Sequence, residues 1–199
     1  MKNFYDAVKE RRTIHVLGSQ EVISEERLDD IIKQAVNYLP TAFNGQEQRA
    51  VLLLGQNHSW FWETVTAKIK AMVPAEEFPA SADRLNGFAS GAGTILVYQD
   101  TAIIQHFEEN FTLYKHHFAT WSHQASGMLK YLLWTSLQVE GYAASLQHYT
   151  ELVEEEVTAK FGLNPSWKMV GQIPFGNAES EPNPGKTFEP LENRVLTFK

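Results

Sequence analysis

The sequence predicts a single α+β domain, and three observations support this fold class. At 199 residues the chain has the usual length of one domain. Short runs rich in leucine and β-branched residues lie between segments whose apolar residues recur at helical spacing, which indicates a mixture of strands and helices. No linker, internal repeat or low-complexity block divides the chain, so we expect residues 1–199 to form one domain.

The first half of the chain predicts two helices, a strand and a third helix. Helices are expected at 4–12 and between an N-cap at Ser24 and the helix-stopping Pro40. A buried strand at 49–54 and a helix at 60–72 follow. The prolines beyond this helix predict a loop, which leads to the next strand.

The second half contains one long helix that is apolar nearly all round, at 117–140, ended by Gly141. Such a helix is expected at the centre of the fold or at a subunit interface. The other expected elements are strands at 94–98, 142–146 and 168–175 and a helix at 151–161. The tail is too polar for a core element, yet its last residues alternate between apolar and polar up to Phe198. This alternation predicts a strand, and a sheet of the partner subunit is one candidate place for it.

The composition excludes several classes of protein. With a formal net charge of −7 and no compensating basic stripe, the chain is not expected to bind nucleic acid. It has no apolar run of about 18 residues and no signal-like N-terminus, so we expect a cytoplasmic protein that does not contact the membrane. The absence of cysteine removes disulfides, thiolate nucleophiles and thiolate metal sites.

Two segments carry groups that suit a phosphate and a planar heterocycle. Arg11-Arg12-Thr13-Ile14-His15 combines guanidinium groups, a hydroxyl and an imidazole, although such a cluster is also compatible with charges that simply complement a helix dipole. Pro40-Thr41-Ala42-Phe43-Asn44-Gly45-Gln46 offers amides that donate and accept, as the edge of a uracil-like ring requires, but its composition also suits an ordinary turn.

Taken together and in this order, the two segments resemble the opening signatures of the nitroreductase family of FMN enzymes. The similarity continues through the long helix at 122–140, the exit Gly141-Tyr142, the segment Gly171-Gln172-Ile173-Pro174-Phe175-Gly176, and the closing segment 185–192. The short chain and this closing segment are most similar to the branch called fatty-acid-repression-mutant-like nitroreductases.

This resemblance implies a three-layer α/β/α sandwich, with a mixed and mainly antiparallel sheet around the long helix. It also implies an intertwined homodimer in which residues 177–199 extend onto the partner subunit. Two FMN sites would then be shared between the subunits of each dimer.

The resemblance also implies the residues that bind FMN. Arg11 and Lys186 would bind its phosphate, and Arg12 and Thr13 the phosphate or the ribityl chain. Thr41, Ala42 and Asn44 would reach the flavin from the other subunit, and Pro40 and Gln46 of the same segment are also assigned to the cofactor. Leu146, Gln147 and His148 would act through main-chain amides near flavin N5 and O4. No side chain is expected to be catalytic, because the flavin carries the redox chemistry.

The chain departs from the family pattern at two positions. His15 stands near the flavin pyrimidine edge, where many members have Lys or Arg, so the charge that stabilises reduced flavin is expected to be weaker or pH-dependent here. Phe188 replaces the second basic residue of the closing segment, and Arg194 is a candidate to supply the missing phosphate contact.

Other patterns give no competing site. The histidines have no metal-ligand spacing and are expected at the surface or in a substrate channel, so no metal is expected: His106, His116, His117 and His123. The glycines at 87–93 precede their strand, unlike a dinucleotide-binding loop, and are expected in a turn. Most tryptophans are expected in the core or an interface, while a few aromatic residues could wall a pocket: Phe107, Phe111, Tyr114 and Phe118.

The sequence therefore predicts an FMN-dependent oxidoreductase that takes hydride from NADH or NADPH through flavin N5 in a ping-pong reaction. The acceptors would be small planar aromatic molecules, either nitroaromatics or quinones. A flavin-binding regulator that senses redox state or lipid metabolism with little turnover is the alternative.

Overall fold

An antiparallel sheet forms the middle layer of the computed structural model, which describes residues 3–182, 184 and 186–199. Its strands lie in the order β1-β5-β3-β2, and β4 pairs with the β5 strand as well. Every strand pairing in the described chain is antiparallel, and a parallel bridge joins Thr13 to Ala144. The strands are β1 Leu17–Gly18, β2 Gln48–Leu54, β3 Gly93–Asp100, β4 Ala143–Ala144 and β5 Trp167–Ala178.

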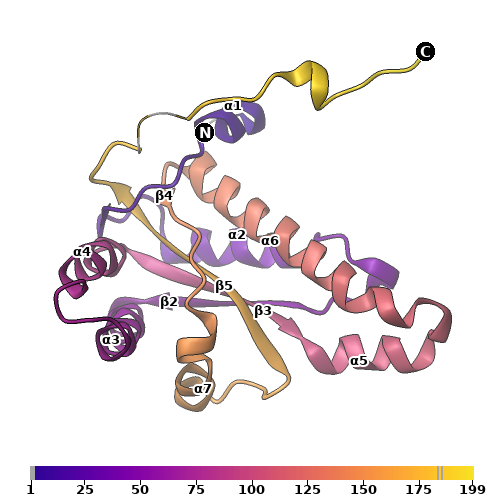
Figure 1. The fold of residues 1–199 in the computed structure, drawn as a ribbon, viewed down its shortest axis with the longest axis horizontal. Coiled ribbons are helices and arrows are strands. Elements are labelled where there is room, and N and C mark those ends of the chain that lie inside the picture. Colours follow the sequence, from indigo (N-terminus) through magenta and orange to yellow (C-terminus); the bar gives the residue numbers. More distant parts are fainter. Residues whose placement is uncertain (1–2, 183, 185) are drawn as a thin grey trace.

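Helices cover both faces of this sheet (Figure 1). The α-helices are α1 Phe4–Glu10, α2 Glu25–Asn37, α3 Gly55–Met72, α4 Phe78–Ala89, α5 Thr101–Asn110, α6 Phe118–Glu140 and α7 Thr150–Phe161. Short 3-10 helices are η1 Ala42–Asn44, η2 Thr112–His117 and η3 Leu191–Asn193. The α+β class and the three-layer arrangement expected from the sequence are confirmed.

Alternation along β3 divides the core into two halves, because successive side chains of a strand point to opposite faces. Ile95 and Val97 pack with α2 and α6 on one face. Leu96 and Tyr98 pack with α3, α4 and α7 on the other. The long helix α6 buries Leu129 and its neighbours one and two turns on against the first face, so its apolar character serves the core of this chain.

A buried histidine links the second half of the core to the sheet. Trp62 Nε1 donates to Thr94 Oγ1 at 2.9 Å, and His58 Nδ1 lies 2.9 Å from the same hydroxyl. The carbonyl oxygen of Ala89, 3.1 Å from Nε2, can only accept, so Nε2 carries the proton of the neutral imidazole and Nδ1 accepts from the Thr94 hydroxyl. Burial lowers the pKa of His58 below its ordinary value, in agreement with a neutral ring.

The structure corrects several boundaries. The proline-containing segment expected to be a loop contains helix α4, because Pro79 lies in the first turn, where a helix tolerates proline. Helix α3 begins at Gly55 rather than at Trp60, since polar residues hide its first turn from an apolar pattern. The turn expected at the glycines is wrong for two of them, as Gly87 lies in α4 and Gly93 begins β3.

Other differences are smaller. Helix α1 ends at Glu10, two residues before the expected end at residue 12, and Arg11 is its C-cap. The strand expected at 142–146 is reduced to Ala143–Ala144. Helix α5 at 101–110 was not anticipated, and it begins where the Asp100 side chain accepts a hydrogen bond from Ala102 N at 3.3 Å.

The C-terminal tail leaves the domain and extends away from it (Figure 1). Residues 195–198 form no strand within the described chain, and their apolar side chains are exposed: Val195, Leu196 and Phe198. The strand that the alternation predicts is therefore not formed within the described part of a single chain.

Candidate functional site

The basic cluster after α1 lies against the C-terminal half of α6. The Arg11 guanidinium carbon is 4.2 Å from the centroid of the Trp134 ring, a cation–π contact. Arg11 Nε and Trp134 Nε1 are both buried, and neither has a hydrogen-bond partner among the described residues. Buried donors are normally satisfied, so these two neighbouring donors have hydrogen-bonding capacity that the described chain does not use.

The later residues of this cluster lie beside the segment 144–148, which begins at the end of β4. Thr13 forms a parallel bridge with Ala144, and Ile14 N donates to the Ala144 carbonyl at 3.2 Å. Gln147 exchanges both main-chain hydrogen bonds with Gln172 of β5, at 2.8 and 2.9 Å. Sequence reasoning placed these two segments in one site, and the structure brings them together.

The same pairing leaves two backbone amides unused. Gln147 N–H and Tyr149 N–H point toward β5, where they donate to the carbonyl and the side-chain oxygen of Gln172. Because amides alternate along an extended chain, those of Leu146 and His148 point the opposite way. Neither has a hydrogen-bond partner in the part of the chain that the structure describes. They are available to acceptors of a bound ring.

His15 lies in this region, half-buried against α4. Its ring meets the edge of Phe88 with centroids 5.8 Å apart. Burial lowers the pKa of His15, and the nearby cation of Arg84 lowers it further. A second titratable residue behaves similarly: burial first, and then the cation of Lys130, lower the pKa of His148. Both imidazoles are therefore biased toward the neutral form.

Lys130 reaches this region from α6. Its Nζ donates to the carbonyl of Val170 at 3.1 Å. The register of β3 and β5 shifts next to Val170, which leaves that carbonyl outside the regular ladder. Burial lowers the pKa of Lys130. The ammonium group is thus tied to the sheet, and its charge is felt at His148.

The second predicted segment forms a strained turn around η1. Phe43, Asn44 and Gln46 have φ values of 55°, 54° and 50°, a region that residues other than glycine rarely adopt. Thr41 holds the turn closed, because its Oγ1 accepts from Gln46 N at 2.9 Å and its carbonyl accepts from Asn44 N at 3.1 Å. Such strain persists where the surroundings impose it, and it is common at ligand sites.

Ionic and aromatic contacts support this η1 turn. Arg49 donates to the Gln46 carbonyl at 2.6 Å and to Asp100 at 3.0 Å. The Phe43 ring packs among aromatic rings from α5, η2 and the start of α6, with centroids 5.0 to 6.3 Å away: Phe107, Phe111, Tyr114, Phe118 and Trp121. Beside them a cavity of about 440 Å³ is lined by Pro40, Ala42 and Met128, among others.

The two predicted halves of the site do not meet within one chain. The η1 turn contacts the first turns of α6 through Trp121, whereas Arg11 contacts Trp134. Thirteen residues of helix separate these tryptophans, or about 20 Å along the axis. Figure 1 shows the two regions at opposite ends of α6. One copy therefore presents two half-sites.

The predicted contacts in the tail are exposed. Lys186 Nζ lies 5.2 Å from the Phe188 ring, and Arg194 donates to the carbonyl of Glu189 at 3.4 Å. Gly185, which opens the closing segment, lies outside the described residues. Arg12 is half-buried at the end of α1. Neither tail cation contacts Arg11 in the described chain.

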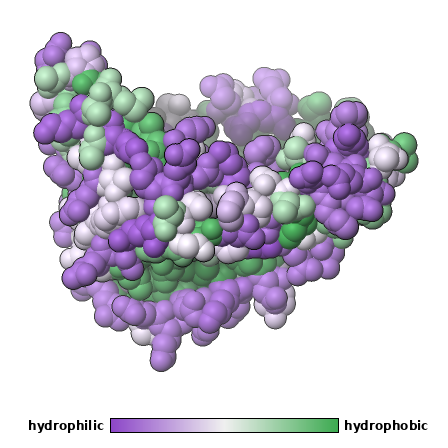
Figure 2. Space-filling model, turned by 90° about the horizontal axis from the view of Figure 1, so that it is seen from below, coloured by the Kyte–Doolittle hydropathy of each residue, from purple (hydrophilic) through white to green (hydrophobic). Residues whose placement is uncertain are grey.

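A groove of about 700 Å³, lined by both polar and apolar residues, runs along the free edge of the sheet, between α2 and β2. Hydrophobic residues form its floor: Ile32, Val36, Leu39, Ala50 and Leu52. Figure 2 shows a hollowed hydrophobic strip flanked by hydrophilic rims on the face seen from below. Strand β2 has β3 as its neighbour on one side only, so its other edge is unpaired within the described residues.

The described residues show neither of two other features, a metal-binding cluster and a membrane-spanning helix. Among the described residues, no three His, Asp or Glu side chains cluster closely enough to hold a metal ion. No helix in that same part of the chain combines the length and the apolar character needed to cross a bilayer.

The model of the nitroreductase family matches residues 8–177. The chain belongs to the nitroreductase family. This membership confirms the resemblance read from the sequence. Among curated relatives, the Saccharomyces cerevisiae protein HBN1 is 31% identical over 192 residues, covering 94% of this chain and 93% of that protein. The nitroreductase FRM2 of the same yeast is 28% identical over 190 residues, with 94% and 93% coverage, in agreement with the fatty-acid-repression-mutant-like branch.

Solved nitroreductases share the fold. Nitroreductase CinD from Lactococcus lactis, in complex with chloramphenicol, has a TM-score of 0.89 and 37% identity, covering 99% of this chain and 100% of that one. A nitroreductase with bound FMN from Desulfitobacterium hafniense has a TM-score of 0.72, with both chains fully covered, and its 18% identity makes it a likeness of fold alone. As a nitroreductase family member, this chain is placed among oxidoreductases.

Sequence reasoning missed Arg84, Phe88 and Tyr149 as neighbours of the site. Arg84 and Phe88 lie on α4, in a segment read as a loop, so no helical face could be assigned to them. Tyr149 directly follows His148, and its ring meets Trp62 at 5.9 Å. Its position after the predicted amide segment was the one signal that could have drawn attention to it.

Proposed function

We propose that this protein is a homodimeric FMN-dependent oxidoreductase that uses NADH or NADPH to reduce nitroaromatic or quinone-type acceptors. The observation that carries the proposal is the pair of buried, unpartnered donors at Arg11 and Trp134, beside the free amides of Leu146 and His148. An anionic group and the acceptor edge of a planar ring would satisfy both sets of donors.

The protein's own groups would bind and orient FMN. Arg11, Arg12 and Thr13 would hold the phosphate and ribityl chain, with Lys186 and Arg194 brought in by the tail. The Leu146 and His148 amides would donate to the ring where its electron density changes, because fixed donors need not reorganise during reaction. When bound, FMN supplies the chemistry: hydride from NADH or NADPH enters at N5 and leaves to the acceptor in a second step.

The other half of each site would come from the second subunit. About 20 Å of helix separates the two half-sites in one copy, so a twofold arrangement is needed to bring the η1 turn of one subunit to the basic cluster of the other. Pro40, Thr41, Ala42, Asn44 and Gln46 would then border the flavin. The Thr41 hydroxyl accepts its hydrogen bond inside the turn, and its proton remains to be donated to a ligand.

The acceptor would lie against the aromatic residues around Phe43. These rings border a cavity of about 440 Å³, a size that suits a small planar molecule. CinD of Lactococcus lactis has been solved in complex with chloramphenicol and with 4-nitrophenol, both nitroaromatic compounds. We extend that acceptor class to this chain.

The first test is FMN retention. Arg11→Ala combined with Lys186→Ala should yield purified protein with much less bound flavin, because two phosphate contacts are lost. Lys70→Ala with Lys160→Ala removes the same charge from exposed positions on α3 and α7 and should retain flavin. The visible spectrum measures the flavin and circular dichroism the fold. A folded Arg11/Lys186 variant with full flavin content would overturn the phosphate assignment.

The second test separates an enzyme from a flavin-binding regulator. Under anaerobic conditions NADH or NADPH should bleach the flavin spectrum, and a nitroaromatic or quinone should restore it over many turnovers. Bleaching without turnover would favour a regulator that senses redox state or lipid metabolism. A colourless protein that takes up no FMN would overturn both.

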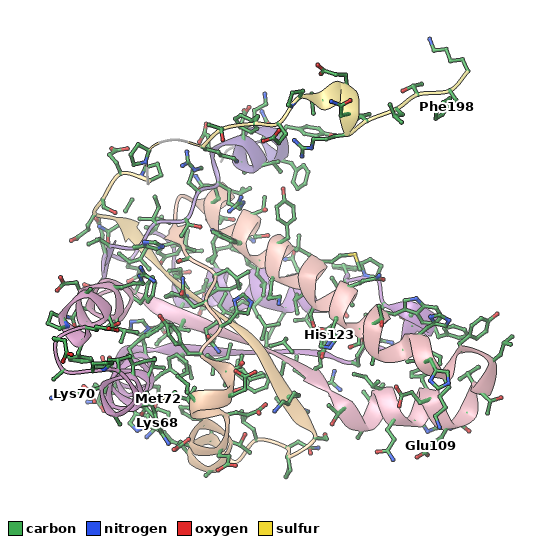
Figure 3. All side chains as sticks on the ribbon, viewed as in Figure 1. Lys68, Lys70, Met72, Glu109, His123 and Phe198 are labelled. Atoms are coloured by element: carbon green, nitrogen blue, oxygen red, sulfur yellow. The ribbon has the colours of Figure 1, made fainter. Side chains whose placement is uncertain are left out.

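We also propose that residues 177–199 of one subunit extend onto the other, with the apolar alternation at 195–198 adding to the free edge of β2. The groove there includes apolar residues, and the tail side chains are exposed, with 69% of Leu196 and 90% of Phe198 accessible. Figure 3 shows Phe198 far from the domain. Leu196→Asp with Phe198→Asp should weaken the dimer in sedimentation experiments, whereas Thr197→Asp, on the alternate face, should not. An unchanged dimer in the double variant would refute this docking.

A further inference from the structure

The site lacks an obvious cation where the proposed function needs one. Two-electron reduction of FMN leaves negative charge at the pyrimidine edge of the ring, and His15 is the sequence-predicted neighbour of that edge. Burial and then the cation of Arg84 lower the pKa of His15, which favours its neutral form. His15 is therefore a weaker source of positive charge than a lysine or arginine at the same position.

The geometry of α4 places another cation there. A Cβ on Gly87 would lie 2.3 Å from the carbonyl oxygen of His15, and the Phe88 ring meets the His15 ring edge-on at 5.8 Å. Arg84 lies three and four positions before these residues, so it is on the same face of the helix. Its side chain is exposed and makes no hydrogen bond or ion pair within the described residues.

A second electrostatic interaction links Arg84 to the residue after the amide segment. The Arg84 cation acts on Tyr149, the residue after His148, as well as on His15. Burial is the larger influence on Tyr149 and raises its pKa, and the cation opposes that rise. The charge of Arg84 thus acts on residues in or next to both segments that would hold the ring.

The other nearby cations are already engaged. Lys130 Nζ donates to the Val170 carbonyl at the irregularity of β5, and the Arg11 guanidinium lies against Trp134 at the phosphate end. Arg84 differs from both because its guanidinium is not committed to the fold. A free guanidinium can form a bidentate contact with the adjacent oxygen and nitrogen acceptors of a reduced ring.

We propose that Arg84 of α4 supplies the positive charge at the pyrimidine edge of bound FMN, in place of the basic residue that many family members have at the position of His15. This role rests on the proposed function. It makes Arg84 a residue that binds two-electron-reduced FMN more tightly than oxidised FMN, and so raises the potential of the bound cofactor.

The test compares the affinity for the two forms of FMN. Arg84→Gln should weaken binding of reduced FMN about fivefold more than binding of oxidised FMN, the effect of removing one nearby charge at an exposed site. For a two-electron couple this is a decrease of about 20 mV in potential. Arg84→Lys should retain most of the preference. Lys70→Gln removes an exposed charge from α3, at the outer edge in Figure 3, and should change nothing.

A measurement without cofactor checks the geometry separately. In the apoprotein, Arg84→Gln should raise the pKa of His15, followed by NMR, while Lys70→Gln should not. If Arg84→Gln left both the affinity ratio and the His15 titration unchanged, the assignment would be wrong although FMN still bound. A changed titration with an unchanged ratio would place Arg84 near His15 but away from the ring, and would equally overturn the role. Failure of the wild-type protein to bind FMN would instead refute the proposed function.

Discussion

Replacing Gly87 by alanine tests the contact between α4 and the His15 segment. A Cβ at this position would lie 2.3 Å from the His15 carbonyl oxygen, and ordinary contact begins at 3.4 Å, so one of the two backbones must move by about 1.1 Å. In an unhindered helix, Gly→Ala stabilises by about 1 kcal/mol. Overpacking against a backbone costs about 1–3 kcal/mol. The net expectation is a destabilisation of about 1 kcal/mol.

Gly127→Ala is the matched control. Gly127 is exposed within α6, and nothing lies within 4 Å of the place of its Cβ. This substitution should stabilise the protein by up to about 1 kcal/mol, from helix propensity alone. For a chain of this length 1 kcal/mol corresponds to about 2–4 °C in melting temperature. The two variants should therefore shift the melting temperature in opposite directions.

The assays are thermal unfolding at fixed protein concentration and FMN titration of the apoprotein. Because Gly87→Ala would displace His15 or Arg84, the affinity for FMN should also fall, whereas Gly127→Ala should leave it unchanged. Equal stabilisation by the two substitutions would show that α4 does not press on the His15 carbonyl, and the geometric basis for placing Arg84 at the site would be lost.

Three further predictions concern the fold and the η1 turn. His58 binds a proton more weakly in the folded chain than in the unfolded one, so the stability it contributes is complete above about pH 6.5 and is lost as the pH falls below that value. Between pH 7.5 and 5.5 the free energy of unfolding in urea should therefore fall by about 1 kcal/mol less in His58→Gln than in the wild type. His123→Asn, at an exposed position labelled in Figure 3, should behave like the wild type. Leu129→Ala should destabilise by about 2–5 kcal/mol in denaturant unfolding because the side chain is fully buried, and a loss below 1 kcal/mol would contradict the packing of α6 on the sheet. Arg49→Met leaves Asp100 without its ion pair and the η1 turn without a donor, so the affinity for FMN should fall. Asp100→Asn keeps a hydrogen bond to Arg49 and should lose less affinity. If both variants bound FMN as tightly as the wild type, the Arg49–Asp100 pair would not support the η1 turn.

Much of the sheet and the long helix could be predicted, because burial leaves a local pattern in the sequence. The apolar run of α6 and its end at Gly141 were recognised within one residue, and Gly141 has the positive φ of 101° that such an end requires. The strand at 94–98 was recognised in the same way, since β3 is buried on both faces. These elements carry their own signals.

Helix α4 shows where such signals fail. Its one proline and one glycine are of the types that indicate loops, yet Pro79 lies in the first turn, and Gly87 has no side chain to meet the His15 backbone that lies against it. The reason for Gly87 is a contact across about seventy residues of sequence, which no local pattern can contain. Arg84 could not be assigned to the site for the same reason.

The two signature segments illustrate a different limit. Each could be recognised from its residues, but their separation is set by α6, whose 23 residues carry Arg11 at one end and the η1 turn at the other. A rigid helix of that length keeps the half-sites apart in one copy whatever their chemistry. Under the proposed dimer, a ligand that bridges the halves must bind to two chains at once, so its binding free energy also stabilises the assembly. The long helix that packs on one face of the sheet would then also be the reason that this chain cannot complete a flavin site alone.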